Sequence, residues 1–306
     1  MASLVNLLAA FSVTVLAVTL IVTWLLSGLL VRRRPADPKI TPDKYGLFYE
    51  HVRFSSRDGI ELGGWLVGNG LSQLAKPGRS VVIFCPGLFG NLYGDVADVP
   101  MFVDVGLDVL QFDWRGHGIS DGGRVTFGLQ EIDDLLGAID FLQARGVQRI
   151  GLMGFSMGGT VALNTAAQDQ RVACVVNDSG YVSFQTALSG YLSSRMALLR
   201  PAIPLLITLT LWMVGVRLSR HLGDTSPLPQ VSQISPRPVL HIYGAADPLV
   251  PVAEQEALLA ATGQPTALWR VPGAGHREAR PQQPEEYERR VTSFFRMNLN
   301  QKGPSV

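Results

Sequence analysis

Ser156 stands in a run of residues whose spacing suits nucleophilic catalysis. Residues 154–158 read Gly-Phe-Ser-Met-Gly, between a short apolar run at 150–153 and a small, helix-compatible run at 160–167. A serine at a strand-to-helix corner must adopt a strained backbone, and flanking glycines remove Cβ atoms that would clash there. Such a corner exposes the hydroxyl, with a helix N-terminus behind it. We predict a nucleophile elbow; the alternative is a glycine-rich structural turn.

A serine hydroxyl becomes a nucleophile when a neighbouring base takes its proton and a third group orients that base. His276 follows the last expected strand, at 267–271, and is the predicted base. Asp247 follows the preceding expected strand, at 239–243, and is the predicted acid. The alternative for Asp247 is a helix cap, and Asp178 is the reserve candidate for the acid. The order serine, acid, histidine along the chain is the one expected of α/β-hydrolases.

Acyl transfer also needs two backbone N–H groups aimed at the oxygen that becomes negatively charged. Met157 directly follows the nucleophile and would supply one of them. The second would come from the loop that leaves an expected strand at 81–85, where Leu88 is the predicted donor. The sequence therefore predicts an oxyanion hole made of Leu88 and Met157.

Eight apolar runs of strand length could hold these loops in place. Two of them, at 49–55 and 60–67, flank Asp58-Gly59 and predict a hairpin with a two-residue turn. Apolar runs alternating with helices are typical of a parallel sheet buried between helices. We therefore predict an α/β fold: an eight-stranded, mostly parallel sheet with helices on both faces. The other strands are expected at 81–85, 109–112, 150–153, 173–176, 239–243 and 267–271, and the helices at 91–105, 129–145, 157–168, 252–261 and 285–299.

Residues 180–235 interrupt this alternation and are predicted to form a cap inserted between two strands. They contain an apolar stretch at 203–216, which is shorter than the ~20 residues that a membrane-spanning helix needs. We expect a buried or interfacial helix here. It would either rest on the membrane surface or pack over the active site as a lid, and both alternatives stay open.

The N-terminal residues predict a membrane anchor. Residues 2–31 carry no charged side chain, and arginines follow at 32–34. This length exceeds the ~20 residues needed to cross a bilayer. The alternative is a cleaved secretory signal, but no basic region precedes the apolar run, the run is too long, and no A-x-A site precedes Arg32. The arginines then place the rest of the chain in the cytoplasm. We predict a single-pass anchor with a basic stop at 1–34.

The remaining composition limits the other classes of partner. The chain has 306 residues and a formal net charge of +1 at pH 7, so nucleic acid is an unlikely partner. Cys85 and Cys174 lie in apolar runs and are expected to be buried free thiols in a reducing compartment. The predicted organisation after the anchor is a linker at 35–44, a hydrolase domain at 45–300 and a tail at 301–306.

Five segments in order resemble the α/β-hydrolase superfamily, above all its N-terminally membrane-anchored, serine-aminopeptidase-like and monoacylglycerol-lipase-like branch. The resemblance covers residues 45–300 and implies a Ser/Asp/His triad with no metal and no organic cofactor. It also implies that the loop containing His117 is mostly structural. The five segments are 86–91, 113–120, 154–159, 244–251 and 271–276.

The chain departs from this resemblance in one place. Relatives usually have His-Gly in the oxyanion loop, where this sequence has Pro86-Gly87. Proline has no N–H, but it fixes φ near about −65° and can stiffen the same turn. Because the expected donor is the N–H of the following residue, we expect activity to survive.

These observations predict a membrane-anchored serine hydrolase that cleaves a carboxylic ester or thioester, with a lipid-like acyl part, through an acyl-enzyme. The expected partners are a small-molecule or lipid ester and the membrane. Two alternatives remain at this point. One is an amide or peptide hydrolase with the same triad, and the other is a catalytically silent, membrane-bound binding protein that keeps the fold.

Overall fold

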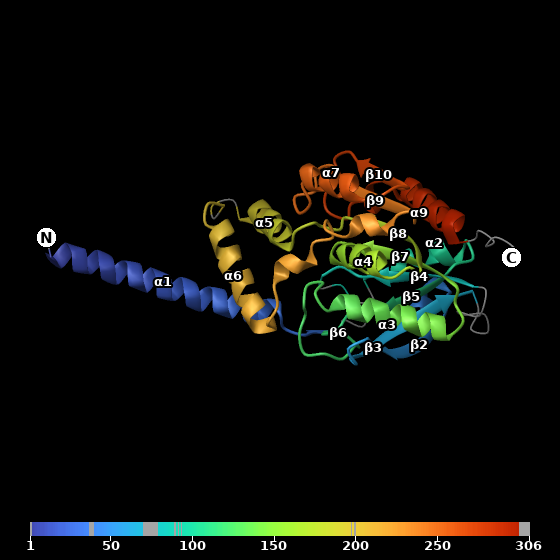
Figure 1. Cartoon of the computed structure of the whole chain (residues 1–306), viewed down its shortest axis with the longest axis horizontal. Helices are drawn as coiled ribbons and strands as arrows, with labels where there is room; N and C mark the ends of the chain where they lie inside the picture. The colour runs from blue at the N-terminus through green and yellow to red at the C-terminus, as the bar shows by residue number, and fades with distance from the viewer. Residues whose placement is uncertain are drawn as a thin grey trace.

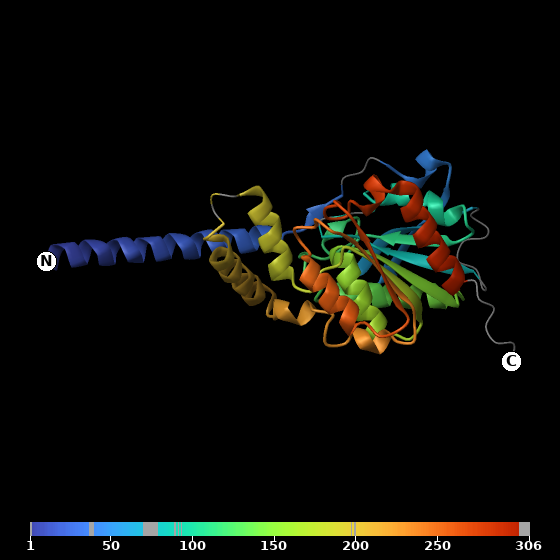
Figure 2. The same ribbon diagram turned by 90° about the horizontal axis from the view of Figure 1, so that it is seen from above.

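A single eight-stranded sheet forms the centre of the molecule in the computed structural model, which describes residues 2–36, 40–69, 79–88, 90, 92, 94–196, 198 and 200–299. The strand order is β10-β9-β8-β7-β4-β5-β3-β2. β3 is antiparallel to both of its neighbours, and every other pair is parallel, so the predicted sheet is confirmed (Figures 1 and 2). The strands are β2 (Phe48–Ser55), β3 (Glu61–Gly68), β4 (Ser80–Cys85), β5 (Asp108–Phe112), β7 (Arg149–Phe155), β8 (Val172–Asp178), β9 (Val239–Gly244) and β10 (Thr266–Val271).

Helices cover both faces of this sheet because its strands are apolar on both faces. In β4, Val81 and Ile83 belong to one hydrophobic core, whereas Val82 and Phe84 belong to the other. Successive strand residues point to opposite faces, so a continuous apolar run needs cover on each side. The first core includes residues of α3 (Glu131–Ala144), α4 (Met157–Gln168) and α7 (Val252–Ala261), and the second includes residues of α2 (Pro100–Val103), α8 (Ala279–Gln282) and α9 (Pro284–Leu299).

The helix predicted at 91–105 is wrong. In its described part the chain forms η3 (Val96–Asp98) and the short α2 (Pro100–Val103), while residues 91 and 93 lie outside the described residues. Proline lacks the N–H that a continuing helix would use, so it starts a helix and does not extend one. Gly106 then adopts φ +82° and turns the chain into β5.

The turn of the β2–β3 hairpin is also wider than predicted. Residues 56–60 separate the last paired positions of the two strands. The Ser56 N–H donates to the Ile60 carbonyl at 2.8 Å, and the Ile60 N–H donates to Ser56 Oγ at 2.8 Å. A two-residue type I′ turn needs positive φ at both central residues. Of Asp58 and Gly59, only Gly59 has it.

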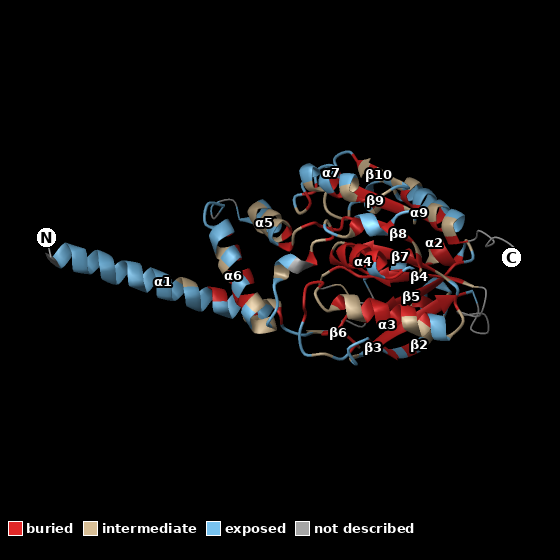
Figure 3. Cartoon of the chain, in the orientation of Figure 1, coloured by how far each residue is buried: buried red, intermediate tan, exposed pale blue. Residues whose placement is uncertain are grey.

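The stretch between β8 and β9 holds two helices that stand beside the body of the molecule, where the insertion at 180–235 is predicted. They are α5 (Phe184–Arg195) and α6 (Ile203–Leu218), followed by η5 (Leu222–Thr225) and η6 (Val231–Ile234). α6 buries Ile207 and Val214 and leaves Leu205, Trp212 and Val216 exposed (Figure 3). The apolar residues at 203–216 thus form one helix with both a packed and an open face.

Helix α1 (Ala2–Leu30) projects from the body as a long apolar rod (Figures 1 and 2). Among the described residues, it is the helix long and apolar enough to cross a membrane. Its last turns pack against α6, which buries Thr23 and Ser27 completely. Arg217 of α6 donates to Ser27 Oγ at 2.8 Å and to the Trp24 carbonyl at 2.9 Å. Its guanidinium also lies 3.6 Å from the centre of the Trp24 ring.

The residues that directly follow α1 form backbone hydrogen bonds with the body of the molecule. The Val125 N–H donates to the Val31 carbonyl at 3.0 Å. β1 (Arg34–Pro35) then pairs in parallel with β6 (His117–Gly118). Of the predicted linker at 35–44, the first residue therefore already belongs to a small sheet. Residues 37–39 of that linker and the predicted tail at 301–306 lie outside the described residues.

Candidate active site

Ser156 occupies the corner between β7 and α4 with a strained backbone. Its φ of 51° and ψ of −118° lie outside the regions that residues with a Cβ ordinarily adopt. The Ser156 N–H donates to the Asp178 carbonyl at 2.8 Å, which ties the corner to β8. A Cβ on Gly158 would overlap the carbonyl group of Cys85, so only glycine allows α4 to approach β4 this closely. The chain thus has the geometry of a nucleophile elbow here.

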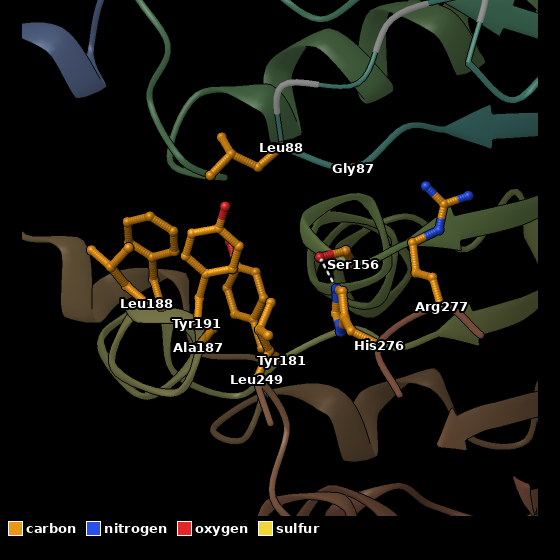
Figure 4. Close-up of a pocket in the computed structure, with 11 residues that line it drawn as sticks. Gly87, Leu88, Ser156, Tyr181, Ala187, Leu188, Tyr191, Leu249, His276 and Arg277 are labelled. Carbon is orange, nitrogen blue, oxygen red and sulfur yellow. Dashed lines mark hydrogen bonds between the residues drawn. The ribbon is translucent and has the colours of Figure 1, made fainter. Parts of the chain in front are cut away.

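The three predicted triad side chains meet in one hydrogen-bonded line (Figure 4). Ser156 Oγ lies 2.9 Å from His276 Nε2, and His276 Nδ1 lies 2.8 Å from Asp247 Oδ2. Because Nδ1 faces a carboxylate, it carries the ring proton, and Nε2 is left to accept the serine proton. The histidine is partly exposed and the aspartate is buried, so the carboxylate acts on the ring in a largely water-free setting.

Asp247 is held by the turn that follows β9. Its Oδ1 accepts the Leu249 N–H at 2.8 Å and the Val250 N–H at 3.2 Å, which leaves Oδ2 for the histidine. These two donors precede helix α7, whose N-cap is Pro251. The alternative interpretation of Asp247 as a helix cap is therefore wrong.

The reserve acid, Asp178, belongs to a neighbouring network. Its carboxylate accepts the Ser179 hydroxyl at 2.8 Å and the Tyr287 hydroxyl at 2.7 Å. Burial raises the pKa of the Asp178 carboxyl. Ser179 Oγ in turn accepts the backbone N–H of Arg277, the residue after His276, at 3.1 Å. This network braces the histidine loop, a contribution that no pattern in the sequence indicates.

Both predicted oxyanion donors lie near the nucleophile. Met157 is the first residue of α4, and Leu88 borders the cavity that contains the serine hydroxyl (Figure 4). A Cβ on Gly87 would come within 3.5 Å of the Cβ of Ser156, so the loop passes directly over the elbow. Their role as donors stays a prediction.

The proline that replaces histidine in the oxyanion loop has a fixed carbonyl. Trp114 is fully buried, and its Nε1–H donates to the Pro86 carbonyl at 2.8 Å. A long-range hydrogen bond therefore braces this loop in addition to the proline ring itself. Phe89 and Asn91, which also belong to the resemblance in this segment, lie outside the described residues.

His117 lies away from the triad, on β6. Its ring is fully buried, and Nδ1 lies 3.1 Å from the Arg115 carbonyl. Burial lowers the pKa of this imidazole. Its surroundings agree with the structural part that the resemblance implies for this loop.

The two cysteines are buried free thiols on opposite faces of the sheet. Cys85 belongs to the core beneath α4, and Cys174 belongs to the core beneath α9. Burial raises the pKa of both thiols. Neither is therefore poised to act as a nucleophile near neutral pH.

A cavity of about 290 Å³ opens beside Ser156 and is mainly apolar on one side. Figure 4 shows Leu88, Leu188 and Tyr191 on that side of the serine, and Arg277 on the other. The Arg277 guanidinium is 2.6 Å from Asp95, so its charge is compensated. Apart from Leu88, these lining residues were not predicted from the sequence, although the closely spaced aromatic residues of the insertion were an available signal. The apolar wall consists of Leu88, Tyr181, Phe184, Ala187, Leu188, Tyr191 and Leu249.

Comparison with known proteins agrees with this architecture. The family model described as alpha/beta hydrolase fold matches residues 80–200. The protein YfhR of Escherichia coli O157:H7 is 26% identical over 272 residues, which cover 87% of this chain and 86% of YfhR.

Two solved structures are similar over most of the chain. The esterase Pf2001 of Pyrococcus furiosus superposes with a TM-score of 0.70 at 23% identity, covering 88% of this chain and 98% of the esterase. The alpha/beta hydrolase GrgF of Penicillium sp. sh18 gives a TM-score of 0.64 at 22% identity, covering 83% of this chain and 100% of GrgF. The sheet order, the match to the family model and the likeness to these structures together show that the chain has the α/β-hydrolase fold.

Proposed function

We propose that this protein is a membrane-anchored serine hydrolase that cleaves a carboxylic ester or thioester with an apolar acyl part. The observation that carries the proposal is the unbroken line of hydrogen bonds from Ser156 through His276 to Asp247 at the edge of an apolar cavity. The family match and the likeness to an esterase support hydrolysis as the reaction class.

Under this proposal each of these groups has a part in acyl transfer. His276 takes the proton of Ser156 as Oγ attacks the carbonyl carbon, and the N–H groups of Leu88 and Met157 stabilise the oxyanion. Collapse of the tetrahedral intermediate expels the alkoxide or thiolate, which receives the proton from His276, and leaves an acyl-serine. Water then attacks this acyl group with His276 as base, which releases the acid and restores the serine.

The residues that line the cavity favour a substrate with an apolar acyl group. Aromatic and aliphatic side chains form the wall on one side of the nucleophile, as expected of a site that binds an alkyl or aryl chain by burial. The same triad would also cleave an amide. That alternative finds no particular support in this cavity, because the described side chains that form its acyl side are aliphatic or aromatic.

The N-terminal helix supports attachment to the membrane. Its 29 residues are roughly 44 Å long at ~1.5 Å per residue, which exceeds the ~30 Å of the hydrocarbon core. Arginines follow at residues 32–34, and the positive-inside rule would place the catalytic body in the cytoplasm.

Helix α6 would then lie along the membrane surface. It runs across the direction of α1 and packs against the end of α1 next to the body (Figure 1). It exposes the large apolar side chains of Leu205 (63%) and Trp212 (62%). An apolar face with a tryptophan is typical of a helix that rests in the interfacial layer of a bilayer. This arrangement would place the cavity close to its lipid-like substrate.

Covalent labelling tests the proposed chemistry. A fluorophosphonate probe should label the full-length protein in detergent, and the Ser156→Ala variant should remain unlabelled. A separate sample of wild-type protein that has not been treated with the probe should hydrolyse p-nitrophenyl esters faster than the p-nitroanilides of the same acids. Equal labelling of both proteins would contradict the assigned nucleophile, and a preference for the anilides would favour an amide hydrolase.

A further inference from the structure

One aromatic side chain lines both the cavity of the nucleophile and a second cavity. Phe184, the first residue of α5, borders the cavity that contains Ser156 and also borders a cavity of about 360 Å³. The second cavity lies between the start of α5, one face of α6 and η5. Its apolar lining consists of Val182, Phe184, Leu211, Trp212 and Leu222.

The Phe184 ring is held firmly at the position where it lines both cavities. The side chain is buried, and its ring stacks on that of Phe127 with centroids 4.8 Å apart and an interplanar angle of 29°. Ser183 caps the helix at the same point, because its Oγ accepts the Thr186 N–H at 3.3 Å. The start of α5 is thus fixed both by a ring stack and by a helix cap.

The supporting ring comes from a strained residue. Phe127 has φ +58°, a conformation that is unfavourable for a bulky side chain. The buried carboxylate of Glu131 holds it there by accepting the Thr126 N–H at 2.9 Å, the Thr126 hydroxyl at 2.6 Å and the Gly128 N–H at 2.7 Å. Strain that is imposed by several hydrogen bonds at a cavity wall points to a function for the residue it positions.

The second cavity leads toward the proposed membrane face. Trp212 borders it and is largely exposed on α6. Trp212 and Leu222 also border a further hollow of about 510 Å³ along the same helix. An alkyl chain that passed Phe184 would therefore continue toward the side of the molecule on which α6 faces the bilayer.

We propose that the second cavity is an acyl subsite that the Phe184 ring closes off from Ser156, so that Phe184 sets the length of the acyl group. This inference rests on the proposed function, since it concerns the acyl part of the same ester. Shorter acyl chains end in the first cavity against the Phe184 ring. Longer chains gain nothing from their additional methylenes until the ring is removed.

Truncation of the ring tests this assignment. The kcat/KM values of the full-length protein in detergent are measured for p-nitrophenyl esters from butyrate to palmitate. In Phe184→Ala the ratio of long-chain to short-chain kcat/KM should rise at least about tenfold, because each buried methylene is worth about fourfold in binding. An unchanged chain-length profile in this variant would overturn the proposal.

A second substitution shows whether the second cavity itself receives the chain. Gly223 borders that cavity, and a Cβ added there would meet nothing within 4 Å. Gly223→Leu in the Phe184→Ala background should therefore return the long-chain ratio toward the wild-type value. A long-chain gain that persists in the double variant would overturn the assignment of the subsite.

Leu188→Ala serves as the matched control, because Leu188 borders the first cavity and is not among the residues that line the second. It enlarges the space beside Ser156 without opening the wall. If Leu188→Ala produces the same long-chain gain as Phe184→Ala, added volume is the cause and the proposal fails.

Fluorophosphonate labelling distinguishes a failure of the proposed subsite from a failure of the proposed function. A separate sample of each variant must label at Ser156 before the chain-length profile of the untreated variant is compared. Phe184→Leu replaces Phe184→Ala if the latter does not fold. If a variant reacts with the probe at Ser156 but its untreated sample has the chain-length profile of the wild type, only the proposed subsite is contradicted. Wild-type protein that does not label, or labels equally as Ser156→Ala, contradicts the proposed function.

Discussion

Two regions of this molecule differ in how completely the chain provides hydrogen-bond partners and packing for its own side chains. At the carboxyl ends of the strands, the carboxylate of Asp247 is buried and its hydrogen bonds reach the nucleophile without a gap. At the α1–α6 end, large apolar side chains such as Leu205 and Trp212 stay exposed. The first region is complete within the chain, whereas the second has an apolar surface that lipid would cover under the proposed function. This contrast separates the substitutions that should stop the chemistry from those that should weaken access to a membrane.

The largest effect is expected from removing the nucleophile. Ser156→Ala should lower kcat by about 10⁶-fold, the loss typical of deleting a triad serine. The thermal unfolding temperature and membrane attachment should be unchanged, because the substitution removes one oxygen atom at the cavity. Steady-state ester hydrolysis and differential scanning fluorimetry measure both effects. Residual activity of a tenth of the wild-type value would contradict the assignment.

The next effect concerns the acid. Asp247→Asn should lower kcat by about 10⁴-fold, because an amide at this position stabilises the wrong tautomer of His276. Asp178→Asn is the matched comparison, since its carboxylate is also buried but bonds to Ser179 and Tyr287. It should cost far less activity than Asp247→Asn. If the Asp178 variant is the slower of the two, the acid has been assigned to the wrong residue.

Low pH should destabilise the folded domain that carries the triad. His241 on β9 is fully buried, its Nδ1 lies 3.0 Å from Asn177 Nδ2, and its Nε2 lies 3.1 Å from Thr262 Oγ1. Burial lowers the pKa of His241 to about 4. A base with a lowered folded-state pKa takes up its proton preferentially when unfolded, so stability is full above the unfolded value near ~6.5 and falls as pH drops toward 4.

This loss should reach at most about 3 kcal/mol at the low end of the range. His241→Gln should therefore show a weaker dependence of unfolding free energy on pH between 7 and 4 than the wild type. Denaturant titrations at several pH values measure the slope. Identical slopes in the two proteins would contradict a neutral, buried His241.

The smallest effect is expected at the membrane end. Leu205→Glu combined with Trp212→Glu should lower turnover of long-chain esters in vesicles about tenfold, because charged groups disfavour contact of α6 with the bilayer. Hydrolysis of a water-soluble acetate ester by the same protein should change little. Met213 is unsuitable for this test, since it is buried and its sulfur contacts Thr23 Oγ1 at 3.4 Å. Equal losses with both substrates would show that the substitutions disturb the site itself.

Much of the fold was predictable because it depends on periodic patterns. The eight apolar runs became the eight strands of the central sheet, and α4 and α7 have the predicted bounds. The positions of Ser156, Asp247 and His276 followed from where strands end, since the carboxyl ends of parallel strands meet at one edge of the sheet. Local repetition of this kind leaves a signal in the sequence.

Contacts between single residues far apart in the chain left no such signal. Arg217 packs on Trp24, and Phe127 supports Phe184, but neither pair belongs to a repeating pattern. The prediction of a two-residue hairpin turn was wrong for a related reason. Asp58 is held by Arg115 at 2.6 Å, a partner that lies well beyond the turn. Tertiary contacts of this type decide details that local propensity leaves open.

The central claim, that Ser156 forms an acyl-enzyme with the help of His276 and Asp247, is tested most directly by trapping that intermediate. Full-length protein is mixed with an excess of a p-nitrophenyl ester, quenched in acid within milliseconds, digested and analysed by mass spectrometry. The account predicts that one acyl group is attached to Ser156, and that the adduct is absent in Ser156→Ala. Ester turnover without a covalent adduct, or with the adduct on another residue, would contradict it.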